Sequence, residues 1–237
     1  MASSQKQEKI ELPPIAGKLF WLREVDSTQL ESRKLIDAGQ KIPFVVLADC
    51  QTAGRGRFMR KWLSPPGGLY FSWATQFVPH PAVSLAAGIA VLSAIKKFCP
   101  GKIFLKWPND ILTDDGKVAG ILAEKYNDAL ILGVGVNLVG AGKFPGLGID
   151  PARKIDLLTE IFCQMDEIWE EFAAGGFRKF VRRYLELTFP PGTPITVVDG
   201  RRTFSGVFEN ITPDGELVVR VGEKSLKFSA GEVSLKL

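Results

Sequence analysis

The sequence changes character at about Pro190, and this change limits the folds that the chain can adopt. Before it, strand-like apolar runs alternate with amphipathic helical segments, whereas residues 190–237 hold only short β-like runs separated by Asp-Gly and Gly-Glu turns. Short strands with frequent turns are typical of a small barrel. We therefore predict a loosely held polar arm at residues 1–17, an α+β domain at residues 18–189 and a small all-β barrel domain at residues 190–237.

Hydrophobic periodicity predicts the elements of the α+β domain. Asp26, Ser27 and Thr28 are candidate caps of its first helix, and Gly39 is expected to end that helix. The expected helices cover residues 25–39, 81–98, 156–176 and 177–187. The expected strands are a buried one at 43–49, an alternating one at 68–77, a pair at 103–112 broken by Pro108, and two at 118–126 and 129–139 that follow an Asp-Asp-Gly hairpin turn.

Composition excludes several classes of function. No run of about 18 apolar residues occurs, so no membrane-spanning helix is expected, and the polar N-terminus is not that of a secretory signal. The single His80 argues against a histidine-based triad or a multi-histidine metal site, and three sparse cysteines suggest reduced thiols in the cytoplasm. Neither "GVGVNLVG" nor "GAGKF" completes a dinucleotide or phosphate-loop motif. The net charge of +4 suits an acidic ligand or partner without identifying a nucleic-acid binder.

A basic segment, residues 52–68, separates the first two of these strands. It contains Arg55, Arg57, Arg60 and Lys61 and no acidic residue. An arginine fork makes paired hydrogen bonds to phosphate or carboxylate, and the glycines beside Arg55 let the backbone approach a ligand closely. The segment suits a loop that wraps a small anion. A solvated basic loop and a nucleic-acid patch remain open as alternatives.

A second polar cluster lies in "KWPNDILTDDGKVAG". Lys106, Asn109, Asp110 and Lys117 fall within one strand-turn-strand unit, and Pro108 frees the two residues after it to face a cleft. Asp110 is suited to help hold Mg²⁺ or to orient a cation, and Lys117 to reach a carboxylate or phosphate. An ordinary Asn-Asp turn with surface lysines is the alternative.

Three further side chains are ambiguous from the sequence. Trp62 and Trp107 are suited to stack on a base or ring, but each alone also fits a core position. Asn137, in an apolar strand, needs a partner if it is buried, and that partner is either a ligand or the backbone.

The order of these motifs resembles that of biotin protein ligases. The resemblance is carried by "DSTQ", "QTAGRGRFMRKW", "SPPGGLYFSW", "KWPNDI", "KVAGILAE" and "LGVGVNL", from about Leu19 to Val139, and more weakly by the C-terminal "GEVSL". It implies the mixed sheet with helices shared by class II aminoacyl-tRNA synthetases and lipoate ligases, followed by an SH3-like barrel. It also implies an ATP- and Mg²⁺-dependent enzyme that forms biotinyl-5′-AMP and transfers biotin to a lysine of a biotin carboxyl carrier protein.

The resemblance also assigns roles to individual residues. Lys117, Arg55 and Asp110 are the expected catalytic groups, and no residue is assigned as a dedicated metal ligand. The expected biotin-binding residues are Ser27, Thr28, Gln29, Gln51, Arg55, Gly56, Arg57, Lys117 and Gly120. The expected ATP- and adenylate-binding residues are Arg57, Arg60, Trp62, Lys106, Asn109, Asp110, Lys117 and Asn137. We expect the basic loop to be mobile when empty and to order over the adenylate, shielding the anhydride from water.

Members of this family that repress genes carry an N-terminal helix-turn-helix. The short tail before Lys18 leaves no room for one, so we expect a ligase that binds neither DNA nor membrane; a homodimer remains open. Two other classes are kept as alternatives. A nucleic-acid-binding module would show steep salt dependence and no ATP chemistry, and a lipoate-type ligase would carry an arginine-rich motif that is not seen here. Labelled biotin and ATP would separate all three.

Overall fold

The computed structural model describes residues 10–235 and contains two β-sheets. The larger sheet has the strand order β1-β2-β3-β7-β6-β5-β4. Its strands are β1 (Lys18–Val25), β2 (Phe44–Gln51), β3 (Leu69–Gln76), β4 (Ile103–Lys106), β5 (Asp110–Thr113), β6 (Gly116–Tyr126) and β7 (Ala129–Val136). Only β1 and β2 run parallel, and helix α1 (Thr28–Asp37) supplies the crossover that a parallel pair requires. The other neighbours are antiparallel, so the sheet is mixed, as expected.

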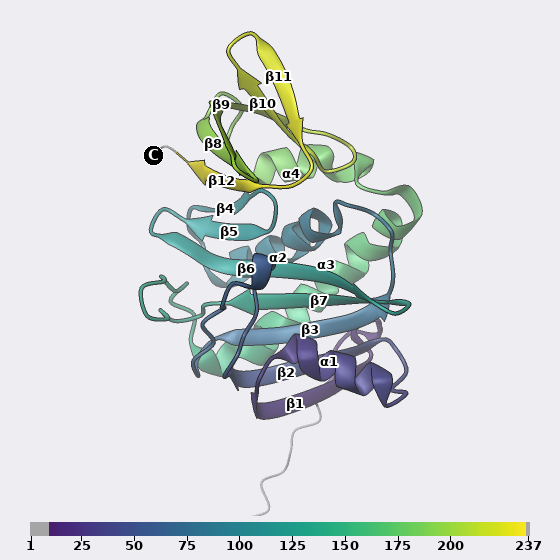
Figure 1. Cartoon of the computed structure of the whole chain (residues 1–237). Coiled ribbons are helices and arrows are strands. Elements are labelled where there is room, and N and C mark those ends of the chain that lie inside the picture. Colours follow the sequence, from purple (N-terminus) through teal and green to yellow (C-terminus); the bar gives the residue numbers. More distant parts are fainter. Residues whose placement is uncertain (1–9, 236–237) are drawn as a thin grey trace, which may run out of the picture.

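Helices cover the large sheet on both faces. Figure 1 shows α1 in front of the sheet and α2 (Val83–Phe98) and α3 (Lys154–Gly175) packed together behind it. This cover explains one difference from the sequence prediction. The strand expected to alternate, β3, is buried along its whole length up to Thr75, because side chains on both of its faces meet helices.

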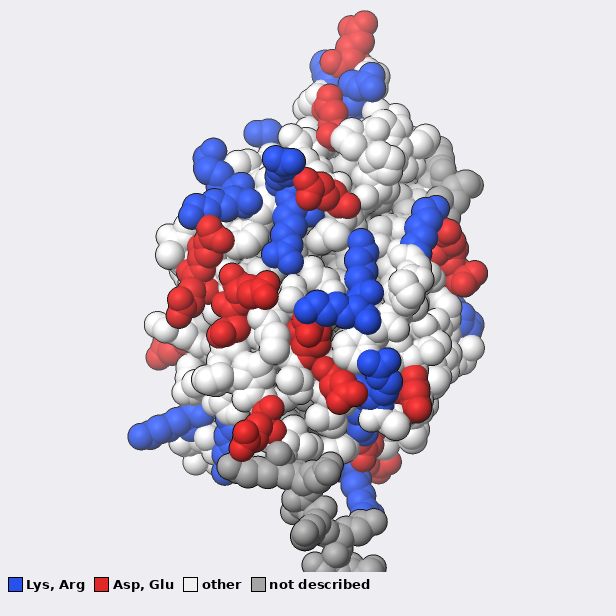
Figure 2. Space-filling view, turned by 180° about the vertical axis from the view of Figure 1, so that it is seen from behind, with Lys and Arg blue, Asp and Glu red and all other residues white. Residues whose placement is uncertain are grey.

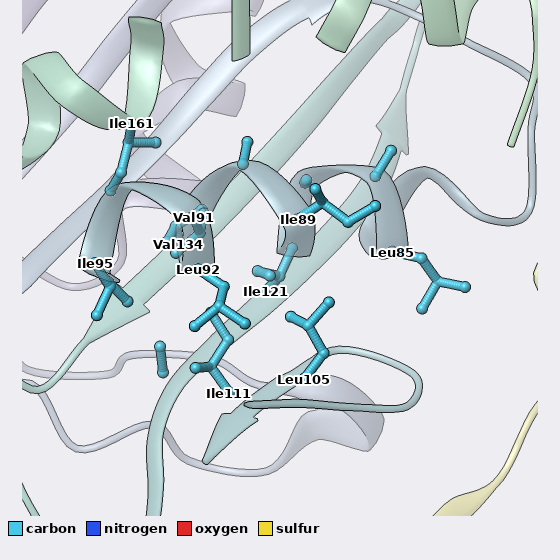
Figure 3. Close-up of a cluster of buried hydrophobic side chains, with 14 of the residues drawn as sticks. Leu85, Ile89, Val91, Leu92, Ile95, Leu105, Ile111, Ile121, Val134 and Ile161 are labelled. Atoms are coloured by element: carbon cyan, nitrogen blue, oxygen red, sulfur yellow. The ribbon is translucent and has the colours of Figure 1, made fainter. Parts of the chain in front are cut away.

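The main core lies between the sheet and α2. Figure 3 shows α2 side chains from Leu85 to Ile95 along the helix, with Leu92 next to Ile111 of β5. An aromatic group continues this core beneath α3. The ring centroids of Trp73 and Trp169 lie 4.9 Å apart in an edge arrangement that favours such pairs. Among the described residues, no helix combines the length and hydropathy needed to cross a bilayer.

The C-terminal part forms a smaller antiparallel sheet. Its strands are β8 (Pro194–Asp199), β9 (Arg202–Ile211), β10 (Leu217–Val221), β11 (Lys224–Phe228) and β12 (Glu232–Leu235), in the order β11-β10-β9-β8-β12. The edge strands β11 and β12 are not paired with each other, so the prediction of a barrel is wrong for the described residues: the sheet is open. A 3₁₀ turn (Arg178–Phe180) and helix α4 (Val181–Leu187) lead into it, where one helix was expected.

Two contacts fix the peripheral parts of the chain. Nε1 of the buried Trp107 donates to the carbonyl oxygen of Gly215 at 2.9 Å, which joins the large sheet to the small one. Of the predicted N-terminal arm, residues 1–9 lie outside the described part. The next turn is packed rather than loose, because Ala16 is fully buried and Nε1 of Trp73 donates to the carbonyl oxygen of Ile15 at 3.1 Å.

Trp107→Phe should lower the free energy of unfolding by about 1–3 kcal/mol, because the buried carbonyl of Gly215 loses its donor. Urea unfolding followed by circular dichroism measures the change. Trp21→Phe is the matched control. The half-exposed Trp21 also donates its Nε1, to Asp49, yet its loss should change the stability by less than about 1 kcal/mol. Equal effects of the two substitutions would contradict a structural role for the Trp107 bond.

Candidate active site

A cavity of about 370 Å³ opens on the face of the large sheet that carries α1. The segment after β2 passes in front of this face (Figure 1). Six basic side chains line the cavity against two acidic ones, so it suits an anionic ligand. The basic residues are Arg55, Arg57, Arg60, Lys61, Lys106 and Lys117, and the acidic ones are Asp110 and Glu232.

Gln51, the last residue of β2, organises the polar end of the cavity. Its Oε1 accepts from the backbone N–H of Thr28 at 2.9 Å and from Oγ1 of Thr28 at 3.2 Å, and its Nε2 donates to Oγ of Ser64 at 2.7 Å. The buried Ser72 completes the group by donating to Oγ1 of Thr28 at 2.8 Å. One side chain thereby ties the start of α1 to the end of the basic loop.

Buried polar atoms without partners cluster around the cavity. In the described part of the chain, six buried side-chain nitrogen or oxygen atoms make no hydrogen bond, and four of them belong to cavity residues. These four are Oγ of Ser27, Oε1 of Gln29, Nε1 of Trp62 and Oδ1 of Asp110; the last forms an ion pair with Lys117, so three of the four have no polar partner. An unpaired buried polar group is unfavourable, so such a cluster indicates that a polar ligand supplies the missing partners.

Glycines form the floor of the cavity. Gly120 of β6 and Gly135 of β7 face each other in register, and the indole of Trp62 lies across them. A Cβ atom placed on Gly135 would lie 2.5 Å from Nε1 of Trp62, and one on Gly120 would lie 3.0 Å from Cζ3. A Cβ on Gly133 would likewise lie 2.8 Å from Nε2 of Gln29. Side chains at these three positions would displace the residues that line the site.

Asp110 lies between two lysines at the break after Pro108. Its Oδ1 is 2.6 Å from Nζ of Lys117, and its Oδ2 is 3.2 Å from Nζ of Lys106. Nζ of Lys117 also lies 4.9 Å from the centre of the Trp62 ring, a cation–π distance. The carboxylate therefore fixes the position of Lys117 while leaving the cluster with a net positive charge.

The basic segment is folded as a small hairpin at the rim. An isolated bridge pairs Arg55 with Lys61, and the N–H of Gly56 donates to the carbonyl oxygen of Arg60 at 2.8 Å. Nη1 of Arg57 donates to Oδ1 of Asn109 at 3.2 Å. Burial lowers the pKa of the Arg57 guanidinium, while the charge of Asp110 raises it.

The small sheet closes the cavity on one side. The turn before β12 and its first residues, 231–234, line the cavity. Arg60 forms an ion pair with Glu232, and Nη1 of Arg57 lies 3.5 Å from the carbonyl oxygen of Gly231. The site is thus built from both sheets.

The structure brings the predicted site residues together with one exception. Asn137 does not line the cavity: it is buried, its N–H donates to the carbonyl oxygen of Val118 and its Nδ2 donates to the carbonyl oxygen of Pro145 at 3.3 Å. The predicted residues around the cavity are Ser27, Thr28, Gln29, Gln51, Arg55, Gly56, Arg57, Arg60, Trp62, Lys106, Asn109, Asp110, Lys117 and Gly120.

Sequence reasoning missed some of the cavity residues. Gly133 and Gly135 are two positions apart, so they share one face of β7, and this spacing was the available signal. Phe144 and the 231–234 segment also line the cavity. Their contribution depends on loop and domain packing that no local pattern reveals.

Two family models match the chain. The model described as "Biotin/lipoate A/B protein ligase family" covers residues 21–138, and the one described as "Biotin protein ligase C terminal domain" covers residues 192–236. The matched segments contain the residues that line the cavity from the large sheet, apart from Phe144, and those that close it from the small sheet.

Curated relatives and solved structures agree with these matches. The chain is 32% identical over 231 residues to a biotin--[acetyl-CoA-carboxylase] ligase of Paracoccus denitrificans, covering 84% of this chain and 92% of the relative. It is 30% identical to the bifunctional ligase/repressor BirA of Escherichia coli, over 80% of this chain and 65% of that protein. A biotin protein ligase from Aquifex aeolicus, solved in complex with biotin and ATP, superposes with a TM-score of 0.80 at 29% identity, covering 93% of this chain and 99% of that one. The chain therefore belongs to the biotin protein ligase family.

Proposed function

We propose that the chain joins biotin to ATP in this cavity, giving biotinyl-5′-AMP, and then transfers biotin to a lysine of a biotin carboxyl carrier domain. The observation that carries the proposal is the cluster of unpaired buried polar atoms around a cationic cavity in a chain of this family. The P. denitrificans relative bears the name of this activity, and the A. aeolicus relative was solved with both substrates. Cys50, Cys99 and Cys163 are free thiols, which supports action in the cytoplasm.

The end of the cavity near α1 suits the ureido ring of biotin. A urea group offers one carbonyl acceptor and two N–H donors. Oγ of Ser27 can donate to that carbonyl, and Oε1 of Gln29 can accept from an N–H, so both unpaired atoms would gain partners. Leu122, which pairs with Gly133 on the cavity face, and the Trp62 ring supply apolar lining for the thioether ring and the chain.

The cationic end suits the reaction at phosphorus. A carboxylate oxygen of biotin attacks the α-phosphorus of ATP, the bond between that phosphorus and the bridging oxygen breaks, and pyrophosphate leaves. Arg57, Lys117 and Lys106 can neutralise the charge on the carboxylate and the phosphates, which would otherwise repel each other. Because Asp110 and Trp62 already hold Lys117, its ammonium needs little reorganisation on reaction.

Asp110 also fits a single contact to Mg²⁺ that arrives with the nucleotide. Its carboxylate lines the cavity, and Mg²⁺ is commonly held by one or two carboxylates together with substrate phosphates. The described residues hold no group of three or more histidine, cysteine or acidic side chains that would form a full coordination set. When bound, the ion would neutralise charge on the phosphate oxygens.

The second step needs no nucleophile from this chain. The acceptor lysine attacks the acyl carbonyl, the bond from carbonyl carbon to phosphate oxygen breaks, AMP leaves, and the amine loses a proton. The nearby charges of Arg55, Arg57 and Lys117 lower the pKa of an incoming ammonium, which favours the neutral amine.

A DNA-binding role is not part of the proposal. On the face behind the sheet, both signs of charge are interspersed rather than gathered in one basic stripe (Figure 2).

The direct test incubates the purified protein with labelled biotin, ATP and Mg²⁺, followed by an apo carrier domain of an acetyl-CoA carboxylase. Pyrophosphate and a labelled adenylate should form without the carrier, and the label should move to the carrier when it is added. Absence of both the pyrophosphate and the adenylate would overturn the proposal.

Lys117→Ala should reduce adenylate formation by about 100-fold or more, because a fixed charge that stabilises the transition state is lost. The pyrophosphate release rate measures this effect. Lys125→Ala, an exposed lysine on the same strand, should retain the wild-type rate and serves as the control. A near-normal rate for Lys117→Ala would remove this residue from the mechanism.

Gly135→Ala should raise the KM for ATP by about tenfold or more, because the new Cβ displaces the Trp62 indole from the cavity floor. Steady-state kinetics with varied ATP measures it. Gly175→Ala, where a Cβ would meet no atom within 4 Å, is the control. An unchanged KM for ATP would show that the position of Trp62 does not matter for the nucleotide.

Arg57→Ala should speed dissociation of biotinyl-5′-AMP by about tenfold or more, since charge-assisted hydrogen bonds stabilise by roughly 1.5–3 kcal/mol. A chase with unlabelled biotin and ATP after loading with labelled biotin gives the rate. Arg182→Ala, a highly exposed arginine on α4, is the control. Retention equal to that of the wild-type protein would exclude a contact between Arg57 and the adenylate.

A further inference from the structure

The tip of the hairpin at the cavity rim exposes two large apolar side chains. Met59 is 79% exposed and Phe58 is 63% exposed, more than any other large hydrophobic residue in the described part of the chain. Phe58 lines the cavity mouth, whereas Met59 does not line the cavity at all. The reaction proposed above gives Met59 no role inside the cavity, so its exposure needs another explanation.

The backbone at this tip is one that glycine would adopt more readily. Phe58 and Met59 both have positive φ values, 54° and 59°, in the left-handed region that disfavours residues with a Cβ atom. Large side chains in two consecutive left-handed positions work against the local backbone preference. Such an outlier at a site rim points to a function of the side chains themselves.

The tip is braced from its inner side. The Arg57 guanidinium lies 4.9 Å from the centre of the Phe58 ring and donates to Asn109. The Arg55–Lys61 bridge closes the hairpin behind the tip. These contacts hold the apolar pair at a fixed place beside the cavity mouth.

The charges around the tip indicate what kind of protein surface binds there. Arg55, Arg60 and Lys61 flank the apolar pair. Among the described residues, Glu232 forms an ion pair with Arg60. A protein that brings a lysine to this cavity must pass this rim. Its approach is favoured when the surface around that lysine is acidic.

We propose that Phe58 and Met59 form an apolar knob that docks into a hollow on the acceptor protein, whose surrounding surface is acidic. This inference rests on the proposed ligase function and adds the surface by which the second substrate is recognised. A few buried apolar anchors framed by complementary charges carry most of the affinity of such contacts.

Met59→Asn tests the proposal, because asparagine tolerates the left-handed backbone while removing the apolar group. The purified variant is assayed with biotin, ATP and Mg²⁺ for pyrophosphate release, with hydroxylamine as a small acceptor, and with the apo carrier domain of an acetyl-CoA carboxylase. The kcat/KM for the carrier should fall by about tenfold or more, as for an interface anchor, while the other two rates stay within about twofold. Ile42→Asn is the control: this exposed residue precedes β2, at the strand end opposite Gln51, and should leave all three rates unchanged.

Two further measurements, the salt dependence of the carrier reaction and the effect of a Phe58 substitution, test the same proposal. The wild-type KM for the carrier should rise with NaCl more steeply than the KM for hydroxylamine, because the rim charges are exposed. Phe58→Asn should lower the carrier rate more than the pyrophosphate rate.

Each contrary result has a distinct meaning. An unchanged kcat/KM for the carrier in Met59→Asn overturns the proposal. Equal losses with carrier and hydroxylamine overturn it by assigning the tip to the adenylate site, and a changed sedimentation coefficient of the variant alone overturns it in favour of contact with a second copy. No pyrophosphate from the wild-type protein overturns the ligase function itself, and the docking proposal with it.

Discussion

The cavity exists because two neighbouring strands lack side chains at facing positions. Gly120 and Gly135 leave a flat patch of backbone in the middle of an otherwise close-packed sheet, and Trp62 lies on it. The Trp62 ring in turn holds the Lys117 ammonium by a cation–π contact, and the Asp110 carboxylate holds it by an ion pair. A single bulky side chain on this patch would therefore disturb the ring, the lysine and the basic loop together.

The electrostatic design follows from this arrangement. Six cations around one cavity would repel each other, and Asp110 and Glu232 relieve part of that repulsion. An anhydride intermediate with a phosphate and polar ring atoms would relieve more of it and would also supply partners for the unpaired buried atoms. The mutual repulsion of the cations and the unpaired polar atoms thus make the cavity selective for a polar anion.

Much of the large domain could be predicted from local patterns. Apolar spacing located α2 to within two residues. Pro108 and the Asp-Asp-Gly turn correctly marked the ends of β4 and β5, because these residues restrict the backbone where they stand. The resemblance to biotin protein ligases supplied the residue set, and the fold then gathered nearly all of it around one cavity. The burial of β3 up to Thr75, the absence of Asn137 from the cavity lining and the open small sheet were not predictable in this way. Each depends on which distant element packs against the residue.

Residues 231–234 of the small sheet form one side of the cavity, and this limits which truncations and substitutions the enzyme tolerates. Both sheets border one cavity, so the smaller sheet is not an independent appendage. Removing it would leave Arg60 without its ion-pair partner Glu232 and Arg57 without the Gly231 carbonyl, and would expose the reacting groups to solvent. Substitutions that weaken the contacts between the two sheets would also expose the reacting groups to solvent. Hydrolysis of an activated acyl group would then compete with its delivery, so the junction between the sheets protects the yield of the reaction as well as the fold.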